Sequence, residues 1–95
     1  MSTIYYNDLI STIKRTISQL QNDALTTVGN YAFSYCNSLT SIDLPNVTNV
    51  GNAAFYYCDL LMEIHFAVKN KEAIEALSDY SNKFGATNAT IYFDL

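Results

Sequence analysis

The sequence predicts a short α+β solenoid, in which stacked repeats form a small parallel sheet between a helical N-terminal cap and a helix-strand C-terminal cap. The main observation is an internal repeat, because residues 25–44 and 47–66 align with an offset of 22 residues and 10 of the 20 positions are identical. The identical pairs are Thr26/Thr48, Val28/Val50, Gly29/Gly51, Asn30/Asn52, Ala32/Ala54, Phe33/Phe55, Tyr35/Tyr57, Cys36/Cys58, Leu39/Leu61 and Ile42/Ile64. A fixed period of this size is typical of a fold whose units bury their apolar faces by stacking. On both sides of the repeats the apolar spacing becomes helical, which predicts the caps.

The N-terminal segment predicts an amphipathic helix over residues 5–22. Its apolar stripe consists of Leu9, Ile13, Ile17 and Leu20. Asn7 or Asp8 could cap the helix start by accepting hydrogen bonds from free backbone N–H groups. Since terminal units of a solenoid must cover the open end of the stack, we expect residues 5–24 to form the N-terminal cap.

Each repeat is expected to begin with a loop and to end with a strand. The loops would turn on Gly29 and Gly51, because glycine adopts a positive φ at little cost. Alternating apolar residues predict half-buried strands over residues 41–44 and 63–66, and Pro45 would end the first of them. The period returns the chain to the same pairing position, so these strands should be parallel neighbours. The side chains expected to point outward are Ser41, Asp43, Glu63 and His65.

Residues 67–95 depart from the repeat and are expected to form the C-terminal cap. A helix is predicted from Lys71 to about Tyr80, with Asn70 as its N-cap and Gly85 as a stop shortly after it. Its apolar face would consist of Ala73, Ile74 and Leu77. The run Thr90–Phe93 predicts a third parallel strand, for which the helix provides the crossover.

The composition indicates one folded domain, residues 1–95, and excludes several functions. The formal net charge is −4 and the five basic residues are scattered, so the phosphates of a nucleic acid would be repelled. No apolar run approaches the ~20 residues that span a bilayer, and the first residues lack the pattern of a signal peptide. We therefore expect a cytoplasmic or virion-associated protein rather than a secreted one.

The repeats resemble a known family. The segments GNYAFSYCNSLTSIDLP and GNAAFYYCDLLMEIHF share the run G-x-x-A-F-x-x-C-x-x-L-x-x-I, which is similar to the BspA-like (treponemal-type) leucine-rich repeat. The C-terminal segment also resembles the terminal cap of such arrays in gut bacteria and their phages. The resemblance implies a curved leucine-rich-repeat solenoid that serves in adhesion, attachment or protein interaction. It carries no catalytic motif, and this chain would be a minimal member with two repeats.

Cys36 and Cys58 are repeat equivalents, which places them close together. A disulfide would need a Cα separation near 5.5 Å, which adjacent repeats can supply. The compartment expected here is reducing, however, so we predict free thiols that act as small buried apolar groups. Two cysteines without further ligands do not make a zinc site.

The outward polar residues are the candidate partner face. Asp43 and His65 should be cross-strand neighbours, but no activated nucleophile accompanies them, so no catalytic, cofactor-binding or metal-binding residue is predicted. Tyr56 replaces Ser34 between the repeats and is an interface candidate, whereas Tyr35 and Tyr57 should be structural. The predicted face for a ligand or partner comprises Ser41, Asp43, Glu63, His65 and Tyr56.

These features predict a non-enzymatic interaction module that recognises a protein or a surface glycan. The alternative is a self-associating structural protein, since small domains often depend on oligomerisation. In that case the exposed edge of Thr90–Phe93 would pair with a second copy.

Overall fold

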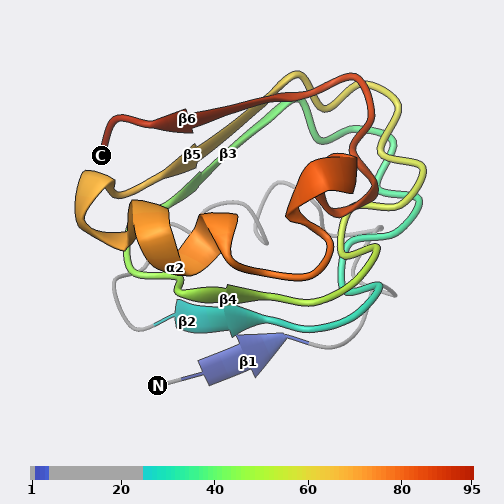
Figure 1. The fold of residues 1–95 in the computed structure, drawn as a ribbon. Coiled ribbons are helices and arrows are strands. Elements are labelled where there is room, and N and C mark those ends of the chain that lie inside the picture. Colours follow the sequence, from blue (N-terminus) through green and yellow to red (C-terminus); the bar gives the residue numbers. More distant parts are fainter. Residues whose placement is uncertain (1, 5–24) are drawn as a thin grey trace.

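Two small parallel sheets face each other across a shared apolar core (Figure 1). The computed structural model describes residues 2–4 and 25–95, so the helix predicted for residues 5–22 lies outside the described residues. The first sheet, with the order β1-β2-β4, consists of β1 (Ser2–Ile4), β2 (Leu25–Val28) and β4 (Asn49–Val50). The second sheet, with the order β3-β5-β6, consists of β3 (Ser41–Leu44), β5 (Glu63–Phe66) and β6 (Thr90–Phe93).

Each repeat contributes one strand to each sheet. The first repeat supplies β2 and β3, and the second supplies β4 and β5. Repeat-equivalent residues are paired: Val28 with Val50 in one sheet and Ile42 with Ile64 in the other. The predicted strands over residues 41–44, 63–66 and 90–93 are confirmed, and so is their parallel pairing. The repeat fixes the register because equivalent residues of stacked units come to the same height.

The core consists of the inward residues of the sheets and the turns between them. Ile42, Leu44, Ile64 and Phe66 are all buried, as the alternation predicts. Between the sheets the rings of Phe33 and Phe55 stack with centroids 5.6 Å apart and planes 11° apart. Fully burying a side chain of this size contributes about 1.5–3 kcal/mol, so each ring of this pair is a substantial part of the core.

The start of each repeat differs from the expected loop. Residues 25–28 and 49–50 are short strands of the β1-β2-β4 sheet, and neither Gly29 nor Gly51 has a positive φ. Gly51 is required for another reason: a Cβ at this position would overlap the backbone nitrogen and the side-chain oxygen of Asn30. The prediction of a positive φ at these glycines was therefore wrong. At Gly51 the residue must be glycine because the two repeats approach each other closely there.

The left-handed backbone lies on other residues of the same turns. Tyr31, Tyr35, Ala53 and Tyr57 have φ values between 55° and 63°. The turn of the first repeat donates hydrogen bonds to that of the second, including Tyr35 N to Tyr56 O at 2.7 Å. An L-residue in this region costs roughly 1–2 kcal/mol, and here the hydrogen bonds between turns hold the conformation.

The segment after β5 is less helical than predicted. It forms the 3-10 helices η2 (Val68–Asn70) and η3 (Tyr80–Gly85), with the five-residue α-helix α2 (Lys71–Glu75) between η2 and η3. The helix ends early because Ser78 and Asp79 bind the second repeat: Ser78 Oγ lies 3.0 Å from Asn52 Oδ1, and Asp79 accepts from Ala53 N at 2.8 Å. No helix in the described part of the chain has the length and apolar character needed to cross a membrane.

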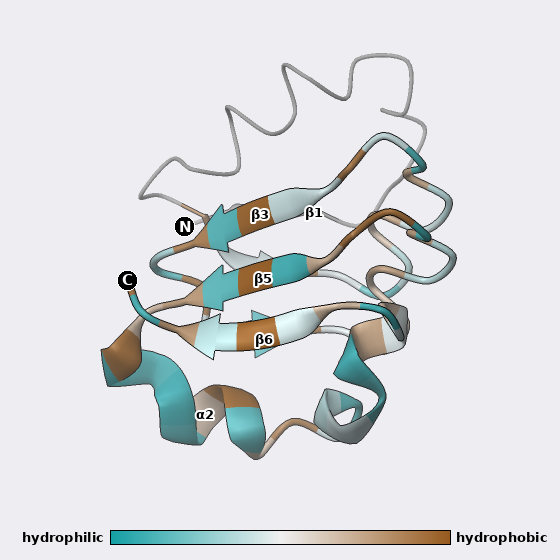
Figure 2. Cartoon of the chain, turned by 90° about the horizontal axis from the view of Figure 1, so that it is seen from above, coloured by the Kyte–Doolittle hydropathy of each residue, from teal (hydrophilic) through white to brown (hydrophobic). Residues whose placement is uncertain are grey.

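The details of this segment only partly follow the sequence pattern. Ile74 is fully buried, but Ala73 is exposed and Leu77 only partly buried. Asn70 does not cap the helix through its side chain, which donates instead to Val47 O at 3.5 Å. Gly85 has the left-handed conformation expected of a stop, with φ at 89°. In the two views α2 lies beside β4 and extends beyond β6 (Figures 1 and 2).

Candidate functional site

The outer face of the β3-β5-β6 sheet gathers polar residues at which the two repeats differ. Ser41 pairs with Glu63 and Asp43 pairs with His65, which confirms the expected cross-strand neighbours. The rows continue onto β6 because Glu63 pairs with Thr90 and His65 pairs with Tyr92. We call this surface the polar face; it consists of Ser41, Asp43, Glu63, His65, Thr90, Tyr92 and Asp94.

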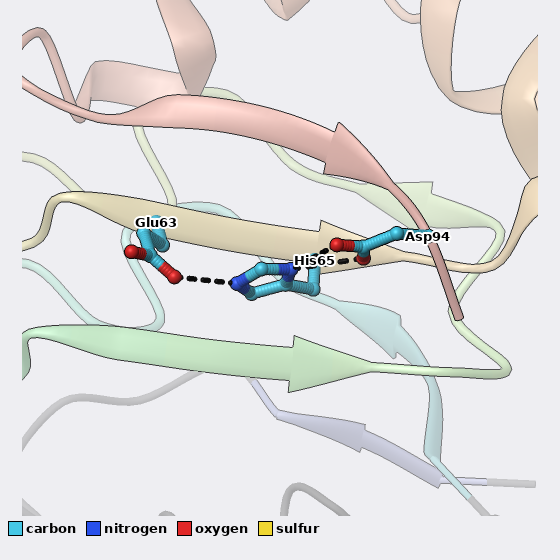
Figure 3. A network of polar contacts seen from close by, with 3 residues as sticks. All are labelled: Glu63, His65 and Asp94. Carbon is cyan, nitrogen blue, oxygen red and sulfur yellow. Dashed lines mark hydrogen bonds and ion pairs between the residues drawn. The ribbon is translucent and has the colours of Figure 1, made fainter.

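His65 lies at the centre of the polar face and binds a carboxylate through each ring nitrogen (Figure 3). Its Nε2 is 2.8 Å from Glu63 Oε1, and its Nδ1 is 2.9 Å from Asp94 Oδ1 and 3.1 Å from Asp94 Oδ2. The ring also stacks on Tyr92, with centroids 4.9 Å apart and planes 12° apart. The His65 side chain is 16% exposed, whereas those of Glu63 and Asp94 are about half exposed.

These contacts favour the charged form of the imidazole. Burial lowers the pKa of His65, but the hydrogen bonds to Asp94 and Glu63 raise it by more than burial lowers it. The pKa of His65 therefore lies above its ordinary value. Both carboxylates accept, which requires a proton on each ring nitrogen. A doubly bound imidazolium offers no lone pair for proton abstraction or metal binding. The geometry therefore favours the positively charged form of His65 at the centre of the polar face.

Asp94 is the member of this network that the sequence analysis missed. It follows β6 directly, and its backbone N–H donates to Phe66 O at 3.1 Å. The alternation of a strand puts Thr90, Tyr92 and position 94 on one face, so the same pattern that predicted β6 contains the signal for Asp94. With Asp43 and Glu63 it gives the polar face three carboxylates for one cation.

Tyr56, the fifth predicted site residue, does not lie on the polar face. It belongs to a second surface, the tyrosine cluster, which consists of Tyr31, Tyr35, Tyr56 and Tyr57. The ring of Tyr56 contacts that of Tyr57 at 4.4 Å and those of Tyr31 and Tyr35 at 6.0 and 5.9 Å, measured between centroids. The hydrogen bond between the Tyr56 and Tyr57 hydroxyls raises the pKa of Tyr56.

The tyrosine cluster is exposed, which differs from the structural role expected of two members. Tyr35 and Tyr57 are each 49% exposed, because the left-handed backbone of the turns directs their side chains away from the core. Tyrosine rings combine a large apolar area with a hydroxyl that remains hydrated, and they are enriched at interfaces. The cluster is therefore a second candidate contact surface.

The two cysteines are buried and free, as predicted. The Cys58 thiol donates to Phe33 O at 2.9 Å, and it also lies within hydrogen-bonding contact of Cys36. This contact lowers the pKa of Cys36, whereas the same contact and burial raise the pKa of Cys58. Both thiols are part of the core between the repeats rather than of a surface site.

Comparison with known proteins identifies the repeat. The family model described as the BspA-type leucine-rich repeat region, with six copies, matches residues 2–88. The chain belongs to this family. The match extends beyond the two predicted repeats on both sides, from β1 to the turn before β6. No curated protein and no solved structure shows significant similarity to the chain.

Membership of the BspA-type leucine-rich repeat family agrees with the two sheets of short parallel strands. Leucine-rich repeats are typically non-enzymatic modules that bind proteins. Among the described residues, no group of three or more His, Cys, Asp and Glu side chains is arranged to hold a metal ion. The family thus suggests a protein-interaction module.

Proposed function

We propose that this leucine-rich repeat protein is a non-enzymatic interaction module that binds a basic segment of a partner protein on its polar face. The observation that supports this proposal is the excess of carboxylates around His65. Asp43, Glu63 and Asp94 carry three negative charges against the single positive charge of the imidazolium, and the whole chain is also acidic, with a net charge of −4. Such complementarity accelerates and selects the encounter with a cationic partner.

The polar face is also well prepared for binding. His65 is held by three polar contacts to two carboxylates and by the ring of Tyr92, so these side chains are already ordered. Binding to an ordered surface loses less side-chain entropy than binding to a mobile one. Asp43 acts on His65 through its charge rather than through a hydrogen bond, which leaves its carboxylate oxygens available to a lysine or arginine.

The terminal segments complete this proposal. Ile74 and Phe84 are fully buried against the second repeat, which supports a capping role for residues 67–95. In the same proposal residues 5–24 cover the opposite end. A stack closed at both ends exposes its sheet face rather than its core, as expected of an attachment module on a bacterial surface or a phage particle.

The test is a titration with a short peptide of alternating lysine and serine, followed by amide chemical shifts. The double variant Asp43→Asn and Glu63→Gln should weaken binding at least fivefold, and added salt should weaken binding to the unmodified protein. Glu72→Gln with Glu75→Gln is the matched control, because it removes two exposed carboxylates from α2 and should leave the affinity unchanged. Equal weakening by both pairs would contradict the proposal, and so would selective binding of a neutral oligosaccharide to the polar face.

A further inference from the structure

The outer edge of β6 is open. β6 is the last strand in the order β3-β5-β6, and β5 is its strand neighbour among the described residues. Figure 2 shows β6 as the outermost strand of this sheet, on the side of α2. We propose that this edge binds an extended, acidic segment of another polypeptide, which adds to the sheet as a fourth strand. This site uses the free backbone edge of β6 rather than the outward side chains of the polar face, and it does not depend on the function proposed for that face.

The backbone pattern shows which groups the edge presents. The N–H group of Thr90 donates to the carbonyl of Met62, directly before β5, at 2.8 Å, and that of Asp94 donates to the carbonyl of Phe66 in β5 at 3.1 Å. In a parallel ladder, the residues between such donors turn their N–H and C=O groups to the other side. Ile91 and Phe93 therefore direct their backbone groups toward the open edge. An extended polypeptide matches this spacing of donors and acceptors, because strand addition pairs main chain with main chain.

The side chains beside the edge form a partly apolar shelf. Leu77, Tyr80, Ile91 and Phe93 pack against the core but are only partly buried. A hollow of about 300 Å³ lies along the first half of the edge and is lined by Tyr80, Ser81, Lys83, Thr90 and Ile91. An added strand turns alternate side chains toward one side of the sheet, and there they would cover this shelf.

The position of α2 favours a single strand over a second copy of the chain. α2 extends beyond β6 on the side from which a new strand must approach, at a level between the two sheets (Figures 1 and 2). Two copies paired through their β6 edges would bring their α2 helices into the same space below the joined sheet. A single extended segment meets one such helix and lies above it.

The charge of the edge indicates an acidic segment. Lys83 lines the hollow at one half of β6, and Lys71 Nζ lies 5.8 Å from the ring centroid of Phe93 at the other half. Two of the five basic residues of an acidic chain thus lie along one strand edge. Lysines at an edge also discourage pairing between identical chains. These two roles of the lysines, protection of the edge and recognition of a partner, have opposite effects on affinity. Lysines that protect the edge weaken the binding of any strand, whereas lysines that recognise a partner strengthen the binding of an acidic strand.

The experiment uses the full chain and two ten-residue peptides, one alternating valine with glutamate and the other alternating valine with lysine. Amide chemical shifts and hydrogen exchange should locate the glutamate peptide at Ile91 and Phe93, and fluorescence anisotropy should show at least fivefold weaker binding of the lysine peptide. The double variant Lys71→Glu and Lys83→Glu should reverse this preference. Thr48→Asp with Asn49→Asp is the control, since it adds negative charge at exposed positions at the start of β4, away from β6, and should preserve the preference.

Three results would overturn the inference. Tighter binding of both peptides after the lysine substitutions would show that the lysines only protect the edge. Shift changes confined to the polar face would place the peptide on the other site and would leave the edge without a ligand. Finally, sedimentation equilibrium could show dimers that the variant Ile91→Pro no longer forms. The edge would then bind a second copy of the chain instead of an acidic segment of another polypeptide.

Discussion

The two repeats mostly share the same residues in their interior, whereas they differ at the outward positions of their strands. Positions that are identical in both copies are mostly buried pairs, such as Phe33 with Phe55, or pairs in direct contact, such as Tyr35 with Tyr57 at 5.1 Å between ring centroids. On β3 and β5 the positions that differ in polar character, such as Asp43 and His65, point outward, whereas Leu44 and Phe66 differ but are both apolar and buried. In a stacked repeat each residue lies beside its own equivalent. Equivalent positions with the same residue therefore indicate packing between the repeats, and outward positions with different residues indicate what the surface can recognise.

The largest effect should come from an identical buried pair. Phe55→Ala removes a ring that is fully buried and stacked on Phe33, and such substitutions cost about 3–5 kcal/mol. For a domain of this size that is a large part of the total stability. Chemical denaturation should show a much lower midpoint, or a chain that no longer folds.

Tyr57→Ala is the matched comparison, because Tyr57 is also identical between repeats but is half exposed. Its loss should cost about 1 kcal/mol, the value of an aromatic contact at the surface. Equal destabilisation by the two variants would show that identity between the repeats does not separate core from surface.

The second prediction concerns two neighbouring turn residues with opposite requirements. Gly51→Ala should destabilise the fold by about 1–3 kcal/mol, because the new Cβ overlaps Asn30 of the other repeat. Ala53→Gly should have the opposite sign and stabilise by up to about 1 kcal/mol, since Ala53 has a φ of 55°. Thermal unfolding of both variants checks the signs, and destabilisation by Ala53→Gly would contradict the strain assigned to this turn.

The third prediction concerns the buried thiols. Cys36 and Cys58 are 2% and 3% exposed, and the contact with Cys36 together with burial raises the pKa of Cys58. Because the reactive species is the exposed thiolate, a thiol reagent should label the native protein only as fast as the repeats open. The labelling rate should then rise with denaturant in parallel with unfolding. Rapid labelling of either thiol in the native protein would show that the cysteine pair is accessible.

The predicted parts of the fold are those with a clear period. Alternation over residues 41–44, 63–66 and 90–93, combined with the 22-residue offset, determined strands, direction and register. The β1-β2-β4 sheet was missed because β4 is only two residues long and because Leu25–Val28 does not alternate apolar and polar residues. The role of Gly51 was missed because sequence does not distinguish a positive φ from a close approach between distant segments.

The candidate site divides in the same way. Four of the five predicted residues share the polar face because strand parity determines which side chains point outward. Tyr56 joins the tyrosine cluster instead, since it lies in a turn whose conformation is held by hydrogen bonds to the other repeat and to η3, such as Phe55 N to Phe84 O at 2.8 Å. Such contacts between segments far apart in the chain cannot be inferred from the local sequence pattern.

The smallest predicted effect separates the outward residues from the core by their response to pH. The contacts of His65 with Asp94 and Glu63 raise its pKa above the ordinary 6.5. The folded protein therefore binds this proton more tightly than the unfolded chain does. This stabilisation is complete below the unfolded pKa and is lost as the pH rises through the folded pKa. The partners are half exposed, so the free energy of unfolding should fall by only about 0.5 kcal/mol between pH 5.5 and pH 8.

His65→Gln should remove this dependence, whereas Asp94→Asn should reduce it and leave the part that Glu63 provides. Denaturation of the three proteins across this pH range measures the slopes. Parallel slopes for the unmodified protein and His65→Gln would mean that the imidazole titrates as it does in the unfolded chain. The polar face would then lack a stabilised positive charge at its centre, and Glu63 and Asp94 would be as free as Asp43 to bind a cationic partner.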